Sequence, residues 1–208
     1  MVCCKILVLL SAFWAAMALA WQVRTARGHG RHDYALPTGS PGKGLWYSFT
    51  GAMMPAHKES IRFHPAEFAV GLVMHMGVVV SLIVVACLLA WPLGAERVIP
   101  AARVVTAAAL VAGLALFIRR LASPMLRSIS VPDDYLASLA TCGLLAGAAF
   151  LPWHDAGGRS ALFIYTTLLF IYLPLGKLRH AVFFFIARGD YGRRLGYRGV
   201  YPPAVEGK

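Results

Sequence analysis

Residues 160–194, SALFIYTTLLFIYLPLGKLRHAVFFFIARGDYGRR, form an apolar segment that is long enough to cross a bilayer. A transmembrane helix needs about 20 predominantly apolar residues. The segment carries one histidine, His180, near its basic end. An ionisable side chain inside a membrane helix is costly and points to a functional role. We interpret this stretch as the last helix of a membrane bundle, and His180 as a candidate functional residue.

The composition of the whole chain also indicates a membrane protein. Its 208 residues are 59% hydrophobic and 14% charged, whereas soluble domains carry about 25% charged residues. The first apolar run resembles a signal peptide ending in AMALA, but only Lys5 precedes it, so we expect a retained helix. We predict an all-α membrane protein, one domain over residues 1–208, with five transmembrane helices at about 6–22, 68–91, 101–118, 135–153 and 160–187.

Lysine and arginine decide the expected orientation of these helices. The long polar loop 23–67 carries six of them, the loop after the third helix three, and the end of the chain from Lys177 onward seven. These sixteen basic residues fall on one side of the membrane and four on the other. Basic loops stay in the cytoplasm. We therefore expect a multi-pass protein of the bacterial inner membrane with a periplasmic N-terminus, and with loop 23–67 and a basic extended tail, 188–208, in the cytoplasm.

The net charge of +11 is also a feature of nucleic-acid-binding proteins. We reject that partner, because the basic residues lie between and after the apolar runs, where membrane proteins carry them. The predicted partner of the apolar runs is membrane lipid.

Two of the seven histidines, His75 and His180, lie in apolar segments. At 1.5 Å per helical residue, His75 lies about 10 Å from the cytoplasmic end of its helix, and His180 about 12 Å from Arg188. Both belong to the cytoplasmic half of the predicted bundle and can face one another. Two neutral imidazoles at matched depth are the ligand set of a b-type haem. The alternative is that each histidine bonds a carbonyl group across a helix interface.

Two cations, Lys177 and Arg179, lie within one turn of His180. Such groups can pair with the propionates of a haem. The alternative is that both side chains extend to the headgroups of the cytoplasmic leaflet.

Three motifs resemble the gamma (cytochrome b) subunit of respiratory nitrate reductase and its wider family. MHMGVVV around His75 resembles the ligand motif of that family's second helix. RRLASPMLRS resembles its basic loop after the third helix, and LPLGKLRHAV around His180 resembles the motif of its last helix. They stand in matching order across most of residues 65–185. The resemblance implies five spans, a cytoplasmic C-terminus and haem.

Members of this family usually bind two haems, through two histidines on the second helix and two on the fifth. In this chain the two further ligand positions are Val85 and Leu162, whose side chains cannot bind iron. The resemblance therefore supports one haem, held by His75 and His180, and does not extend to the outer haem.

Two further motifs, PAHKES and SVPDDY, look closer to the branch of this family in sulfur- and sulfate-reducing bacteria. That branch includes membrane subunits of the high-molecular-weight cytochrome c (Hmc) complex and of the Dsr complex. The short length of this chain and its single pair of haem ligands favour the Hmc complex. The resemblance implies a cytoplasmic iron–sulfur partner like the heterodisulfide reductase catalytic subunit, a quinol-binding membrane subunit and a periplasmic multihaem cytochrome c. Quinone is a further candidate ligand.

A bis-histidine iron has no open coordination position, so it transfers electrons without substrate chemistry. We therefore expect a haem b subunit of a respiratory complex. One rival is a haem-free membrane anchor of such a complex. A second is a small transporter, which would predict carboxylates inside the membrane; the apolar runs offer only Glu67, at an edge.

Overall fold

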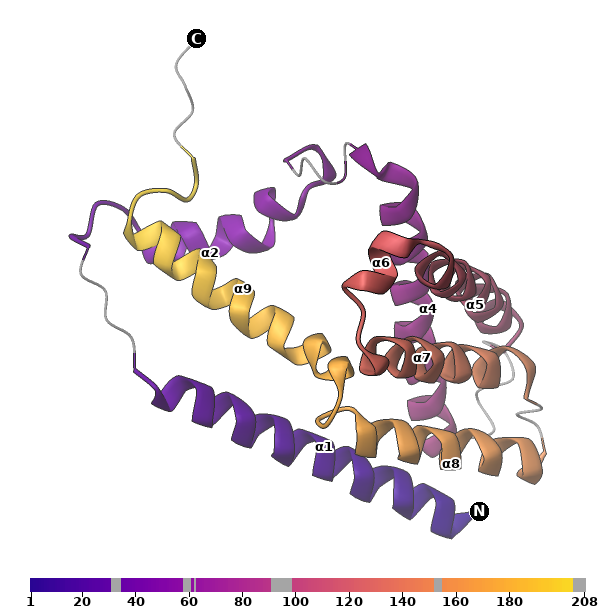
Figure 1. Ribbon diagram of the computed structural model, residues 1–208. Helices are drawn as coiled ribbons and strands as arrows, with labels where there is room; N and C mark the ends of the chain where they lie inside the picture. The colour runs from indigo at the N-terminus through magenta and orange to yellow at the C-terminus, as the bar shows by residue number, and fades with distance from the viewer. Residues whose placement is uncertain (31–34, 58–60, 62, 91–98, 152–154, 204–208) are drawn as a thin grey trace. The chain divides into compact units, whose positions relative to one another are not determined.

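The computed structural model describes residues 1–30, 35–57, 61, 63–90, 99–151 and 155–203 (Figure 1). In those residues the elements are helices and there is no strand, so the all-α prediction is confirmed. The α-helices are α1 (Val2–Gly28), α2 (Pro41–Phe49), α4 (Pro65–Ala90), α5 (Ile99–Ala122), α6 (Pro124–Ser128), α7 (Pro132–Phe150), α8 (Ala156–Tyr172) and α9 (His180–Tyr197). Short 3₁₀ helices are η1 (Gly51–Met53), η2 (Pro55–His57) and η4 (Lys177–Arg179).

Three helices, α1, α4 and α5, are long and apolar enough to cross a membrane. The broken pair formed by α8 and α9 makes a fourth span if the two helices are counted together. Helix α7, which we expected to be a span, is not among those found in the described residues. These helices indicate a membrane protein in contact with lipid, as the sequence predicts. The fifth span and the orientation stay predictions.

The last apolar segment is interrupted, which corrects the continuous helix that we expected over residues 160–187. Helix α8 ends at Tyr172, and α9 begins only at His180. The amides of Leu175 and Gly176 both donate to the Tyr172 carbonyl oxygen, at 2.9 and 3.0 Å, and close a tight turn. Pro174 has no N–H with which to continue the helical hydrogen bonds, while Leu173 before it still has αR backbone angles. His180 therefore lies at the start of a helix and not in the middle of one.

The chain divides into two compact units, and the single membrane domain over residues 1–208 stays a prediction. Unit 1 comprises Met1–Ala18 and Ala66–Leu178, and unit 2 comprises Leu19–Pro65 and Arg179–Lys208. Helix α1 contributes to both.

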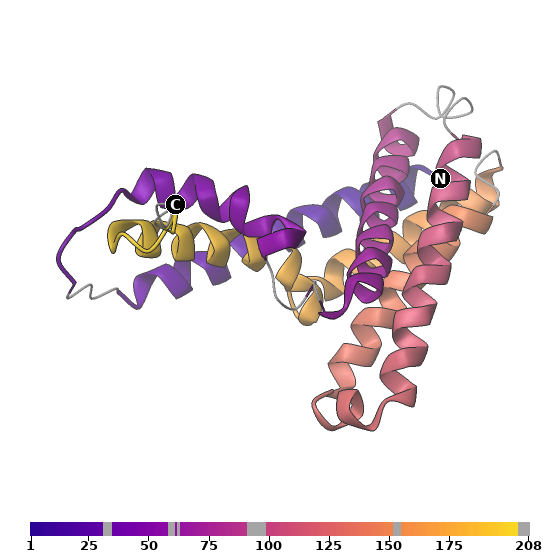
Figure 2. The same cartoon turned by 90° about the horizontal axis from the view of Figure 1, so that it is seen from above.

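Unit 1 is a helical bundle in which α5 packs against α6 and α7, and α7 against α8 (Figure 2). Helix α4 approaches α5 closely at Gly77, where an added Cβ would lie 2.0 Å from the Cβ of Ala109. The Lys5 ammonium of α1 donates to the Leu89 carbonyl oxygen at 2.8 Å. The buried cluster draws on α1, α4, α5, α7 and α8, and consists of Val8, Val84, Val85, Leu88, Ala102, Leu144, Ala148, Leu162, Phe163 and Leu169.

Unit 2 is built on the close pairing of α2 with α9, two helices far apart in sequence (Figure 1). A Cβ on Gly44 would lie 2.3 Å from the Gly192 carbonyl oxygen and 2.4 Å from the Gly196 Cα, so only glycine fits there. Ser48 Oγ donates to the Arg188 carbonyl oxygen at 3.0 Å, and Arg188 Nε donates to the Ser48 carbonyl oxygen at 2.8 Å. Small residues thus bring the two backbones together, as in close helix pairs of membranes.

The pairing corrects our description of residues 188–208 as an extended tail. Residues 188–197 are helical, and Val200 and Tyr201 return to the helix end through bonds to the Leu195 carbonyl oxygen, at 2.9 and 3.2 Å. Residues 204–208 lie outside the described part of the chain. Loop 23–67 is likewise not a plain loop: α2 begins after Ser40, whose Oγ accepts from the Lys43 amide at 3.4 Å. A serine N-cap followed by proline is a standard helix start.

Candidate functional site

His75 lies on α4, in unit 1, and its side chain is exposed. Its ring Nδ1 lies 2.6 Å from the Gly71 carbonyl oxygen. Because a carbonyl only accepts, Nδ1 carries the proton, and Nε2 of the neutral ring keeps its lone pair. A backbone carbonyl that fixes the tautomer in this way is the usual support of a metal-binding histidine. The bond thus leaves Nε2 as the nitrogen that can bind a metal.

The surroundings of His75 are apolar. Leu72, Met76 and Val79, on the same stretch of α4, are 53%, 54% and 50% exposed. Unit 1 therefore leaves this face of the helix uncovered, and the imidazole stands within it. In a membrane such a face contacts lipid, a partner helix or a cofactor.

His180 is the first residue of α9, in unit 2, and it is also exposed. The two predicted haem ligands thus belong to different units, and their pairing stays a prediction. Among the described residues there is no group of three or more histidine, cysteine, aspartate or glutamate side chains that could hold a metal ion. A bis-histidine haem uses only two such ligands.

The two predicted propionate partners have different environments. Lys177 belongs to unit 1, where its ammonium lies 2.7 Å from Asp134 Oδ1, and its amide donates to Asp133 Oδ2 at 2.8 Å. Arg179 belongs to unit 2, is exposed and lines a groove described below. Lys177 is therefore engaged by the carboxylates at the start of α7, which leaves Arg179 as the better candidate for an added anion.

These carboxylates tie together three helix ends of unit 1. Asp134 caps α7 by accepting from the Val131 amide at 2.9 Å, and its other oxygen lies 3.5 Å from an Arg120 nitrogen at the end of α5. Asp133 accepts from the hydroxyl of Tyr172, the last residue of α8. The Lys177 ammonium and the Val131 amide hold the pKa of Asp134 below its usual range. The SVPDDY motif thus has a structural role here.

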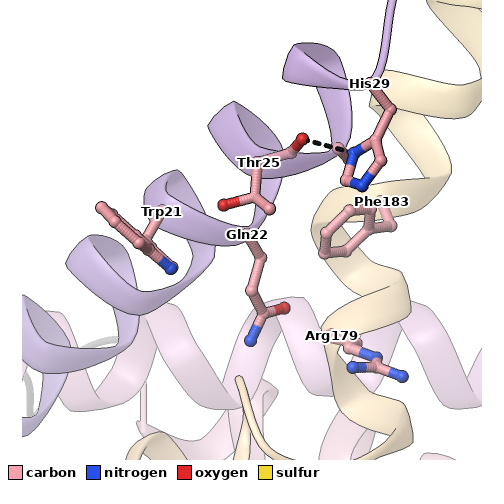
Figure 3. A pocket seen from close by; sticks show the side chains of 7 residues that line it. Trp21, Gln22, Thr25, His29, Arg179 and Phe183 are labelled. Atoms are coloured by element: carbon pink, nitrogen blue, oxygen red, sulfur yellow. Dashed lines mark hydrogen bonds between the residues drawn. The ribbon is translucent and has the colours of Figure 1, made fainter.

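An open groove of about 500 Å³ lies in unit 2 and was not predicted from the sequence. Its lining consists of Trp21, Gln22, Thr25, Ala26, His29, Arg179 and Phe183 (Figure 3). Nδ1 of His29 lies 2.8 Å from the Thr25 carbonyl oxygen, so that bond uses Nδ1 and leaves Nε2 for another partner. In Figure 3 the His29 ring lies beside the Phe183 ring, and the Arg179 guanidinium lies further along the same side. The groove combines two aromatic rings with a cation and several hydrogen-bonding groups.

A signal for unit 2 is nonetheless present in the sequence. Ser40, Gly44 and Ser48 are spaced by four residues, as are Gly192 and Gly196. Small residues at this spacing mark a helix face that a second helix can approach closely. The pattern predicts a helix pair, although it does not reveal the groove beside it.

No protein-family model, curated protein or solved structure matches this chain. The resemblance to the nitrate reductase gamma family therefore rests on the sequence motifs alone.

Proposed function

We propose that the protein is a haem b membrane subunit of a respiratory electron-transfer complex, with His75 and His180 as the iron ligands. The observation that carries the proposal is the state of His75: its tautomer is fixed by Gly71, and its Nε2 is available on an exposed apolar face. The donor set fits the group, because two neutral imidazoles bind haem iron from its two faces.

One haem is supported rather than two. Val85 and Leu162 stand at the positions of the outer ligands in the resembling family, and they are 3% and 0% exposed. Both belong to the same buried cluster of unit 1. Two buried apolar side chains at these positions offer no donor to a second iron, which supports a single haem.

A bound haem would supply one-electron transfer, and the protein would set its potential through burial and nearby charge. We propose that electrons pass between a quinone pool or a periplasmic multihaem cytochrome c and a cytoplasmic iron–sulfur subunit like that of heterodisulfide reductase. A quinol-binding membrane subunit completes the complex.

The finer topology belongs to the same proposal: five spans in the bacterial inner membrane, N-terminus in the periplasm and C-terminus in the cytoplasm. The support is charge, because the described residues of unit 2 include eight lysine or arginine residues and one carboxylate, Asp190. Basic segments remain in the cytoplasm. A green fluorescent protein fused after Lys208 should fluoresce and an alkaline phosphatase fused there should be inactive; the opposite pair of results refutes the orientation.

The ligand assignment is tested with His75→Ala and His180→Ala in the full chain. Each should abolish the b-type absorbance of the purified protein in a pyridine haemochrome assay, while membrane insertion persists. His57→Ala is the matched control, because its Nδ1 makes a similar bond to the Gly51 carbonyl oxygen, at 2.9 Å, in a polar segment. If both ligand variants keep the full reduced spectrum, the assignment is wrong. If the unmodified protein carries no haem, the protein is the haem-free anchor.

A further inference from the structure

We propose that the groove of unit 2 holds the headgroup of an anionic phospholipid. The inference depends on the membrane character of the helices and not on the haem. The volume of the groove, about 500 Å³, lies within the range of about 300–1,000 Å³ that small-ligand sites occupy.

The first argument is the position of the groove along α1. The apolar run of this helix ends at Trp21, and the helix continues as far as Gly28 through Arg24, Thr25 and Arg27. The groove begins at Trp21 and follows the polar continuation. A helix that crosses a membrane passes from the hydrocarbon core into the headgroup region at such a boundary. The groove therefore lies at headgroup level whichever way the helix points.

The second argument is the chemistry of the lining. Trp21 is 72% exposed, and tryptophan favours the membrane interface because its ring is apolar and its N–H is polar. Phe183 adds a second ring, which suits the first carbons of an acyl chain. Arg179 offers a guanidinium, which binds a phosphate through two parallel hydrogen bonds. The Thr25 hydroxyl can donate to a further phosphate oxygen, and Nε2 of His29, an acceptor while Nδ1 donates to the Thr25 carbonyl, can accept from a headgroup hydroxyl.

The third argument is charge. The basic residues of unit 2 that the structure describes are Arg24, Arg27, Lys43, Arg179, Arg188, Arg193, Arg194 and Arg198, against one described carboxylate, Asp190. Such an excess attracts an anionic surface. Trp46, on α2, is 74% exposed close to Lys43. Exposed tryptophans beside cations favour a lipid surface over an acidic protein or a nucleic acid, which would leave these rings in water.

The test measures lipid binding to the full chain, purified in a neutral detergent, by native mass spectrometry with added phosphatidylglycerol or phosphatidylcholine. One phosphatidylglycerol per chain should be retained at higher occupancy than phosphatidylcholine. Arg179→Gln should weaken that binding by roughly fivefold or more, since one cation near an anionic surface contributes about that factor. Arg179→Lys keeps the charge but loses the paired hydrogen bonds, so it should weaken the binding less than Arg179→Gln does. Trp21→Ala should weaken it without changing charge.

Arg193→Gln is the matched control, because it removes the same charge from an exposed position of unit 2 outside the groove. It should keep phosphatidylglycerol binding within twofold of the unmodified chain. Equal losses in Arg179→Gln and Arg193→Gln would mean diffuse attraction and overturn the site. Equal occupancy of the two lipids would also overturn it. So would displacement of phosphatidylglycerol by millimolar inorganic phosphate, or Arg179-dependent binding of polyglutamate without any lipid binding.

Discussion

Replacing Gly44 with alanine should open the helix pair of unit 2. The new Cβ would lie 2.3 Å from the Gly192 carbonyl oxygen and 2.4 Å from the Gly196 Cα, both backbone atoms that cannot rotate away. Overpacking of this kind costs about 1–3 kcal/mol, while alanine in place of glycine in a helix returns about 0.5–1 kcal/mol. The expected net loss is about 1–2 kcal/mol, which is confined to unit 2.

Hydrogen exchange read by mass spectrometry on the full chain in detergent can measure this loss. Peptides covering α2 and α9 should exchange roughly 5- to 30-fold faster, since 1.4 kcal/mol is a factor of ten in an opening equilibrium. Peptides from α7, in unit 1, are the internal reference. Gly42→Ala is the matched control on the same helix, because its Cβ would meet only the Ser40 hydroxyl, at 4.0 Å. Equal exchange in the two variants would refute the close packing.

Two more predictions concern unit 1. The Lys177 ammonium keeps the pKa of Asp134 below its unfolded value of about 3.9, so the carboxylate stabilises the fold above that pH and ceases to do so as the pH falls through the folded pKa. Asp134→Asn should therefore lower the free energy of unfolding by about 1 kcal/mol at pH 7, and by almost nothing at a pH below the folded pKa of Asp134. Thermal unfolding in detergent measures this loss. A loss that does not change with pH would contradict the prediction. Gly77→Ala should lower the free energy of unfolding by about 1–3 kcal/mol, and with it the Tm, because the added Cβ would lie 2.0 Å from the Ala109 Cβ. Gly71→Ala, with open space around its Cβ, should not.

The apolar helices could be predicted because hydrophobic length is a property of each segment alone. Helices α1, α4 and α5 appear where the apolar runs stand, with boundaries shifted by a few residues. The break after Tyr172 also has a signal in the sequence, LPLG, although the long apolar run around it fits a continuous span. Proline is tolerated inside many membrane helices, so its presence alone did not decide between a kink and an end.

Unit 2 was harder to predict because α2 and α9 pair through close backbone contact at glycines, which leaves no long apolar run in the sequence. Residues 188–197 are basic and glycine-rich, a composition that suggests a solvated tail. The spacing of Gly192 and Gly196 marks a helix face that another helix can approach closely. No local pattern identifies the distant segment around Gly44 as that partner. The candidate ligands were found for the opposite reason: a histidine such as His75 stands out in any apolar run. Neither apolar runs nor isolated histidines predict the groove, because its lining residues come from α1 and the start of α9, which are far apart in the sequence.

The bond between Ser48 and Arg188 joins residues 140 positions apart, and this separation has a consequence for biosynthesis. The ribosome releases the segment that becomes α2 long before its partner exists, and contacts of such long range form late in folding. Until the ribosome has made α9, the face of α2 that carries Gly44 has no helix to pack against. A message truncated before α9 would therefore yield a chain whose first half inserts normally yet carries an unprotected segment, the kind of nascent product that cellular proteases remove.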